Sequence, residues 1–236
     1  RLLVDSDVKT RPLLGTFHSI CVKILRQHLH ELDMENSFVI YDSTDQQILV
    51  KRILKNLKID DKKFNPKAIL YAISQAKNQL IGPDEYLKSA FEYFNQKVAE
   101  VYVEYQKELK RSNALDFDDI IMKTVELFKD KPQILEYYQN RFKYISVDEY
   151  QDTNQAQYIL IRQLAAKYEN LCVIGDSDQS IYSWRGANMR NILDFEKDFP
   201  KAKVVLLEQN YRSTKNILAA ADKIIQKNSL RKDKTL

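Results

Sequence analysis

Glycine is scarce in this sequence, and none of it forms a phosphate-binding loop. The 236 residues contain only four glycines, at Gly15, Gly82, Gly175 and Gly186. A Walker A loop has the pattern G-x-x-x-x-G-K-S/T, because its backbone N–H groups must wrap the phosphates of a nucleotide. The pattern is missing here, so a nucleotide site made only of these residues would lack its main hold on phosphate.

Cysteine and long apolar runs are also nearly absent. The two cysteines, Cys21 and Cys172, fall in a helical and a strand pattern, which predicts buried thiols rather than a disulfide or a metal site. No apolar run approaches the roughly 18 residues of a membrane span, and the polar start at Arg1 resembles no secretory signal. We therefore expect a soluble protein of the cytoplasm, and the missing initiator Met predicts a piece of a longer chain.

The charge balance excludes little. The net charge of +4 is too mild to indicate nucleic acid by itself, and the hydrophobic content of 44% is ordinary for a chain with a core. Basic residues crowd positions 51–63 and 223–234. Solvated helix faces explain both runs most simply.

Two carboxylates directly follow a predicted strand. Residues 144–147 have the apolar, β-branched character of a buried strand, and Asp148 and Glu149 come next. Ligands of open α/β sheets bind beyond the carboxyl ends of the strands. Nucleotide-bound Mg²⁺ needs one or two carboxylates, and attack on a γ-phosphate needs a group that orients water. The alternative is that Asp148, Glu149 and Asp152 only favour the N-terminus of a following helix.

Two further predicted strands end in the same way. Residues 171–175 lead to Gln179, and residues 203–207 lead to Tyr211 and Arg212. If helices separate the three strands, right-handed crossovers make them parallel and bring their polar ends to one edge of one sheet. For Arg212 the alternative is a surface salt bridge.

A polar cluster marks the start of the first predicted helix. Thr16 can cap a helix that continues to about residue 32, so Thr16, His18 and Ser19 lie where backbone N–H groups, hydroxyls and an imidazole can hold a phosphate. A plain cap with an exposed histidine is the alternative.

The middle of the chain is predicted to be helical throughout. Within residues 38–111, helices are expected to begin near Asp42 and Ser43 and again at Asn65 and Pro66. One long helix is expected after Gly82. The long helix has apolar residues alternately four and three apart, which predicts packing in a bundle or, alternatively, a partner-binding coiled coil. Because the α/β alternation is confined to the two ends, we expect an all-helical subdomain inserted into an α/β core.

An aromatic and arginine cluster follows the second strand. Tyr182, Trp184 and Arg185 could stack on unpaired bases, contacts that tolerate any sequence. The alternative is that a single tryptophan belongs to the core.

Three of these runs resemble successive motifs of superfamily 1A DNA helicases of the UvrD/PcrA/Rep group. They are VDEYQDTN at 147–154, GDSDQSIYSWRGA at 175–187 and LEQNYRS at 207–213. Two shorter runs, TFHS at 16–19 and LDFDD at 115–119, resemble further signatures of the group in the same order. The resemblance covers the start of the chain and roughly residues 113–220.

The resemblance implies a fold and its boundaries. The fold would be α/β, with part of the parallel sheet of a RecA-like P-loop NTPase and an inserted all-helical subdomain. Motor domain 1A would comprise residues 1–37 and 112–206, the helical subdomain 1B residues 38–111, and the start of motor domain 2A residues 207–236.

The resemblance also implies residue roles. Asp148 would hold Mg²⁺, Glu149 would activate the hydrolytic water, and Gln179 would sense the γ-phosphate. Tyr211 would stack on the adenine of ATP, and Arg212 would serve as an arginine finger. Contacts to single-stranded DNA would come from Thr16, His18, Ser19, Tyr182, Trp184 and Arg185.

The activity implied is ATP-driven 3′–5′ movement on single-stranded DNA with unwinding of the duplex ahead. The DNA substrates implied are single strands and junctions between single-stranded and duplex DNA, and repair or replication proteins are possible partners. The family's Walker A lysine, its adenine-contacting glutamine and its late motifs are absent. We therefore expect the chain to need the missing parts of its own protein and to be inactive alone. The alternatives are a non-catalytic module that binds single-stranded DNA or a partner, and the helicase part of a recombination helicase-nuclease.

Overall fold

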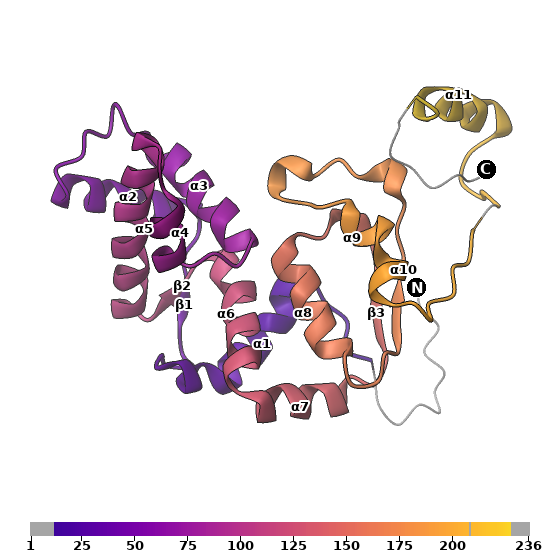
Figure 1. Ribbon diagram of the computed structural model, residues 1–236, viewed down its shortest axis with the longest axis horizontal. Coiled ribbons are helices and arrows are strands. Elements are labelled where there is room, and N and C mark those ends of the chain that lie inside the picture. Colours follow the sequence, from indigo (N-terminus) through magenta and orange to yellow (C-terminus); the bar gives the residue numbers. More distant parts are fainter. Residues whose placement is uncertain (1–11, 208, 228–236) are drawn as a thin grey trace. The chain divides into compact units, whose positions relative to one another are not determined.

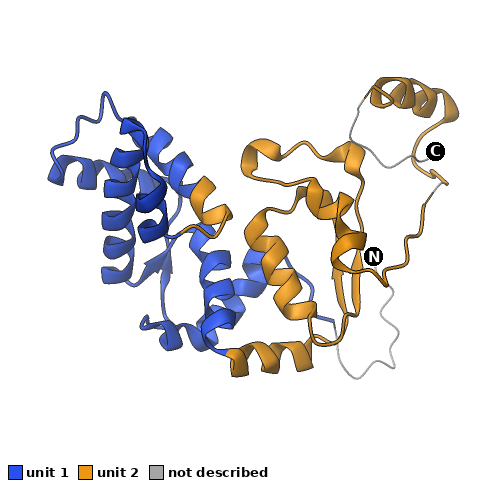
Figure 2. Cartoon of the chain, viewed as in Figure 1, with its two compact units in different colours: residues 1–74, 82–131 blue, residues 75–81, 132–236 orange. Residues whose placement is uncertain are grey.

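The computed structural model describes residues 12–207 and 209–227. The chain divides into two compact units (Figure 2). Unit 1 comprises residues 1–74 and 82–131, and unit 2 comprises residues 75–81 and 132–236. The domain boundaries expected at residues 37, 111 and 206 are a different division of the chain and stay predictions.

Unit 1 contains a pair of very short parallel strands that the sequence did not indicate. Strand β1 (Val39–Ile40) pairs with β2 (Ala114–Leu115), with Val39 opposite Ala114 (Figure 1). The N–H of Tyr41 donates to the carbonyl of Leu115 over 2.9 Å, which extends the ladder by one bond. The chain therefore leaves and rejoins this pair at neighbouring positions.

Four helices lie in the sequence between β1 and β2. They are α2 (Ser43–Asn56), α3 (Pro66–Asn78), α4 (Pro83–Ser89) and α5 (Tyr93–Arg111). The predicted starts are confirmed: Asp42 caps α2 by accepting from the N–H groups of Thr44 and Asp45, and Asn65 accepts from Lys67 N before α3. The end of α3 belongs to unit 2.

The single long helix expected after Gly82 is wrong. The helix stops at Ala90, whose ψ of 85° is not helical, and α5 begins afresh at Tyr93. The break folds α4 against α5 and sets the rings of Tyr86 and Tyr102 edge to face at 6.0 Å. No glycine or proline marks this point, because tertiary packing and not local propensity makes the break.

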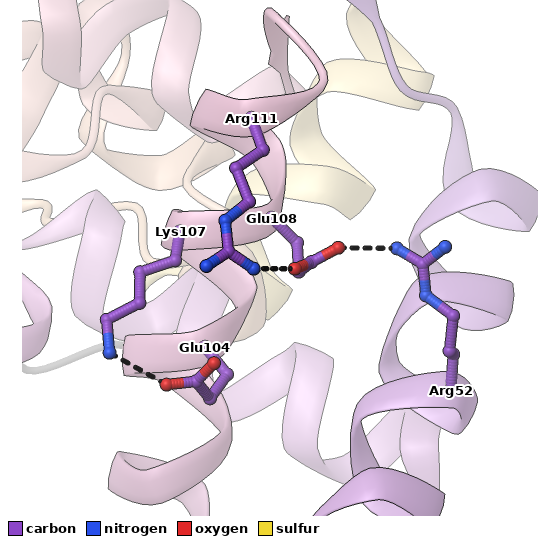
Figure 3. Close-up of polar contacts among 5 residues, drawn as sticks. All are labelled: Arg52, Glu104, Lys107, Glu108 and Arg111. Carbon is purple, nitrogen blue, oxygen red and sulfur yellow. Dashed lines mark hydrogen bonds and ion pairs between the residues drawn. The ribbon is translucent and has the colours of Figure 1, made fainter.

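Helices α2 and α5 pack through an apolar seam with ion pairs at its border. Glu108 accepts from Arg52 over 2.8 Å and from Arg111 over 2.7 Å, while Lys107 pairs with Glu104 on the same helix (Figure 3). Exposed pairs of this kind contribute little to stability. The buried side chains of Leu49, Ile53, Val98 and Tyr102 contribute most of it.

The remaining helices of unit 1 pack around α1 (Phe17–His28). It lies against α6 (Phe117–Asp130), and Cys21 is fully buried there, as predicted. Burial raises the pKa of the Cys21 thiol to about 12, so it stays protonated at neutral pH.

Unit 2 contains the predicted parallel pair. Strand β3 (Ile145–Val147) pairs with β4 (Leu171–Val173), with Val147 opposite Val173, and α8 (Gln155–Ala165) forms the crossover (Figure 1). Helix α7 (Pro132–Arg141) precedes β3. The prediction of a mixed α/β fold with parallel strands is confirmed for these two strands.

Two expectations for unit 2 are wrong. Residues 203–207 form no strand, because within the described residues no segment pairs with them, and Leu207 is 79% exposed. Cys172 is exposed rather than buried, because β4 has only β3 beside it in the described part of the chain.

The helices after β4 are short. The helix expected at 189–198 is two pieces, α9 (Arg190–Leu193) and α10 (Phe195–Asp198), and α11 (Lys215–Ile225) closes the described chain with Thr214 at its N-cap. Among the described residues, none of the helices is long and apolar enough to cross a membrane.

Candidate nucleotide and nucleic-acid site

The turn after β3 carries the first two predicted residues. Asp148 and Glu149 are both exposed, and Asp148 Oδ1 accepts a 2.9 Å hydrogen bond from Glu149 N. Glu149 adopts the left-handed backbone conformation, with φ of 51°, which is unusual for a residue with a side chain. Strain of this kind gathers at functional sites.

The two acids do not cap the following helix. A 3-10 turn, η2 (Tyr150–Asp152), comes first, and α8 has Asn154 as its N-cap with no acidic residue in its first turn. The interpretation of Asp148 and Glu149 as helix-stabilising acids therefore fails.

A buried amide joins the turns that follow the two strands. Gln151 is 1% exposed; its Nε2 donates to Glu149 Oε2 over 2.7 Å, and its Oε1 accepts from Asp176 N over 3.0 Å. The ends of β3 and β4 are thereby tied together. No sequence pattern marked Gln151 as a site residue, although its place within the acidic run was a signal.

The turn after β4 extends this series to Gln179. Asp176 caps the 3-10 turn η3 (Ser177–Gln179) by accepting from Asp178 N over 3.0 Å, and its other oxygen accepts from Gln179 Nε2 over 2.9 Å. Glu149 and Gln179, predicted to share one edge of the sheet, are thus linked through Gln151 and Asp176.

Asp152 faces the same series from within η2. Burial, and next the negative charge of Glu149, raise the pKa of the Asp152 carboxyl, while the backbone N–H of Ile181 partly offsets this. Asp152 is therefore the carboxyl on this turn whose ionised form is costly.

The loop after η3 presents the aromatic and arginine cluster. The guanidinium of Arg185 lies 4.6 Å from the ring centroid of Trp184 and 5.4 Å from that of Tyr182. All three side chains are exposed, with Trp184 at 59%, so the interpretation of Trp184 as a core residue is wrong. They form an open cationic and aromatic surface.

Two side chains at the end of α3 are hydrogen-bonded to this loop and to the start of α8. Gln75 Nε2 donates to the carbonyl of Trp184 over 3.5 Å, and Asn78 is hydrogen-bonded to Asn154. Gly186, with φ of 86°, ends the turn close to these side chains. No local pattern in the sequence could have connected residues so far apart.

In unit 1, the start of α1 forms a polar cluster. Thr16 caps the helix by accepting from Ser19 N over 3.2 Å, and Ser19 Oγ donates to Thr16 O over 2.9 Å. Burial lowers the pKa of His18, so its imidazole is neutral at pH 7. The ring of Phe117, 53% exposed, lies 5.3 Å from the His18 ring, a contact that the sequence did not indicate.

Tyr211 and Arg212 lie in a turn before α11. Asn210 Oδ1 accepts from Arg212 N over 2.8 Å and from Ser213 N over 2.9 Å, and the ring of Tyr211 is 92% exposed. Within residues 12–207 and 209–227, no hydrogen bond or ion pair links the Arg212 guanidinium to Glu149 or Gln179. Their convergence around one phosphate stays a prediction.

The two carboxylates suit a hard cation that needs few protein ligands. Among the described residues, no group of three or more His, Cys, Asp or Glu side chains could hold an ion. Mg²⁺ in nucleotide sites takes one or two carboxylates and keeps its other positions for water and phosphate oxygens. The exposed Asp148 and Glu149 fit this need.

The family of the chain follows from comparison with known proteins. A family model described as the UvrD/REP helicase N-terminal domain matches residues 3–200, and the chain belongs to this family. The resemblance to the UvrD/PcrA/Rep group is thus confirmed. The chain is similar to the ATP-dependent DNA helicase PcrA of Bacillus subtilis (strain 168) and of Staphylococcus aureus, with 56% identity over 223 residues in each case. These matches cover 94% of this chain and 30% of each relative, so the chain spans about a third of their length.

Proposed function

We propose that this chain is part of an ATP-dependent DNA helicase that moves on single-stranded DNA and unwinds duplex. The observation that supports this best is the hydrogen-bonded series Glu149–Gln151–Asp176–Gln179 at the ends of β3 and β4. It joins a water-activating carboxylate to a phosphate-sensing amide, as phosphoryl transfer requires. The printed names of the relatives, ATP-dependent DNA helicase, point the same way.

On the nucleotide side, Asp148 would hold Mg²⁺, and Glu149 orients and deprotonates the attacking water. When bound, Mg²⁺ neutralises charge on the phosphate oxygens of ATP. Gln179 senses the γ-phosphate, Tyr211 stacks on adenine, and Arg212 stabilises the charge of the transition state. The phosphate-gripping loop, which these 236 residues lack, comes from another part of the protein.

On the DNA side, the exposed surface of Tyr182, Trp184 and Arg185 stacks on bases of the single strand. Each base stacked on an aromatic ring contributes about 1–3 kcal/mol in any sequence context. The cluster at the start of α1 holds the DNA backbone through Thr16, His18 and Ser19. Phe117 is a further DNA-contacting residue of this cluster. Because its imidazole is neutral, His18 acts by hydrogen bonding and not by charge.

The architecture fits this role. The β3–β4 pair belongs to a RecA-like motor domain 1A, residues 38–111 form the inserted helical subdomain 1B, and residues 207–236 begin motor domain 2A. The β1–β2 pair, which brackets four helices, supports an insertion at this point. The protein acts inside the cell at single-strand and duplex junctions, with repair or replication proteins as its partners.

The test uses the full-length protein that contains this chain. We expect ATP hydrolysis that single-stranded DNA stimulates, and unwinding of a duplex with a 3′ tail but not a 5′ tail. Glu149→Gln is expected to lower kcat by about 10²–10⁴-fold, the usual contribution of a general base. The matched control is Glu136→Gln. It removes an exposed carboxylate of α7 that is paired with Lys167, just after α8, and it is expected to leave kcat unchanged.

The opposite outcomes are equally clear. Binding of single-stranded DNA without any ATP hydrolysis by the full-length protein would identify a non-catalytic binding module. Unwinding accompanied by DNA degradation would identify a helicase-nuclease.

A further inference from the structure

The amide of Gln151 makes two different hydrogen bonds at the centre of the site. One end donates to the carboxylate of Glu149 over 2.7 Å, and the other accepts from the backbone of Asp176 over 3.0 Å. Its neighbours demand this polarity, because a carboxylate can only accept and a backbone N–H can only donate. An amide rotated by half a turn would face both partners with the wrong atom.

A glutamine is specifically suited to this position. An ionised carboxylate of the same length has no donor for Glu149, a lysine has no acceptor for Asp176 N, and a methionine has no donor and only a weak acceptor. Gln151 is also 1% exposed, so water cannot replace either bond without entering a packed site.

Gly175 provides the room for this amide. A Cβ on Gly175 would collide with Gln151 Oε1 and with the side chain of Ile192 in α9. The two positions are therefore complementary, and the close approach of the turns depends on both.

Thr153, which directly follows the η2 turn that contains Gln151, makes a second set of hydrogen bonds. Asn191 Nδ2 donates to the carbonyl and the hydroxyl of Thr153 over 3.0 and 3.1 Å, and Asn188 N donates to the same carbonyl over 3.0 Å. The segment that carries Trp184 lies between the two attachments, at Asp176 and at Asn188. Both ends of that segment are thus hydrogen-bonded to residues 151–153.

We propose that Gln151 is a positioning residue that couples the carboxylate of Glu149 to the Asp176–Gln179 turn, and through this turn couples the state of the nucleotide to the DNA-contacting loop at Trp184. The inference rests on the proposed function and deepens it. Gln151 itself touches neither nucleotide nor DNA; it acts through Glu149 and Asp176.

The test replaces Gln151 in the full-length protein with two side chains of similar length. Gln151→Met removes both hydrogen bonds. DNA-stimulated kcat is expected to fall by about 10–100-fold, as when a hydrogen-bonded outer partner of an active group is lost, while KM for ATP changes by less than about threefold. The matched control, Gln139→Met, removes an amide bonded to the carbonyl of Gln163 between α7 and α8 and should leave kcat unchanged.

Gln151→Glu tests the polarity of the amide. It keeps an acceptor for Asp176 N but sets a second carboxylate against Glu149, beside Asp148 and Asp152 and across from Asp176. Because like charges repel, the new carboxylate pushes Glu149 from its position. We expect DNA-stimulated kcat to fall by about 10–100-fold, as in Gln151→Met.

A third measurement follows the coupling directly. Trp184 is the single tryptophan of these 236 residues, so its fluorescence reports on the loop once tryptophans elsewhere in the full-length protein are replaced by phenylalanine. Addition of a non-hydrolysable ATP analogue with Mg²⁺ should change the emission of the otherwise unaltered protein and of Gln139→Met, and should change that of Gln151→Met by less than half as much.

The outcomes separate the inference from the proposed function. Unaltered kcat and fluorescence response in the Gln151 variants, with an active parent protein, would overturn the inference and leave the helicase proposal intact. A parent protein without DNA-stimulated hydrolysis would overturn both. If Gln151→Met does not fold, the isosteric Gln151→Glu decides by its kcat and its fluorescence response.

Discussion

The ring centroids of His18 and Phe117 lie 5.3 Å apart with an angle of 58° between the planes, which joins the first turns of α1 and α6 at an exposed point of unit 1. Because the Phe117 ring is 53% exposed, it offers a flat apolar face beside a polar cluster. Such a pairing suits a nucleotide, whose base can stack while its phosphate is hydrogen-bonded.

Phe117→Ala is therefore expected to weaken binding of single-stranded DNA by about 5–150-fold, the loss of one stacked base at about 1–3 kcal/mol. Fluorescence anisotropy with a labelled oligonucleotide measures the change in the full-length protein. Phe91→Ala, at an 85% exposed phenylalanine in the same unit, is the control and should bind normally. Equal affinity of the two variants would remove Phe117 from the DNA site.

Arg185→Lys should separate charge from stacking. Lysine keeps the positive charge but loses the planar guanidinium that lies over Trp184 and Tyr182. We expect affinity for single-stranded DNA to fall about 2–5-fold, matching a cation–π contribution of about 0.5–1 kcal/mol. The slope of affinity against salt concentration should stay the same, because no charge is lost; a reduced slope would indicate that Arg185 binds phosphate instead.

Asn154→Ala should destabilise unit 2. Asn154 caps α8 by accepting from Gln157 N over 2.9 Å, and its amide also bonds Asn78 at the end of α3. Loss of the cap and of a nearly buried bond is expected to lower the free energy of unfolding by about 1–3 kcal/mol. Urea denaturation measures the difference, with Gln155→Ala on the next residue as a control expected to stay within about 0.5 kcal/mol.

The raised pKa of Asp152 predicts a pH-dependent effect on stability. A carboxyl whose pKa is raised on folding favours the protonated form, so its contribution is fully present below its usual pKa of 3.8 and is lost as pH rises through the higher value of the folded state. Asp152→Asn removes the ionised form. Its Tm relative to the unaltered protein should therefore increase from pH 4 to pH 7, and a constant difference across that range would contradict the prediction.

The 236 residues by themselves should hydrolyse ATP negligibly, because they contain no G-x-x-x-x-G-K-S/T loop to hold the phosphates. A phosphate-release assay on the purified chain, with and without single-stranded DNA, measures this. Turnover that DNA stimulates to the rate of the full-length protein would show that the missing loop is dispensable.

Sequence patterns predicted the elements that local chemistry determines. The caps at Thr16, Asp42 and Asn65 were read correctly because a side-chain oxygen next to a helix start satisfies free N–H groups wherever it occurs. The β3–β4 pair was predicted from apolar runs separated by a helix. The acidic residues after β3 also marked the candidate site.

Features that depend on distant partners could not be predicted. The two-residue strands β1 and β2 carry no local pattern and form because Val39 meets Ala114, 75 residues later. Residues 203–207 have the composition of a strand but no partner among the described residues. The support of the Trp184 loop by Gln75 likewise joins residues that only the fold brings together.

The β1–β2 pair also bears on how this family can vary. The two strands are parallel, and parallel strands need a crossover of about a dozen residues or more, which the four helices between Ile40 and Ala114 supply. Whole helices can thus be gained, lost or exchanged between these two points while the flanking backbone keeps its register. The stretch is a natural place for evolution, or for a protein engineer, to insert a new accessory segment.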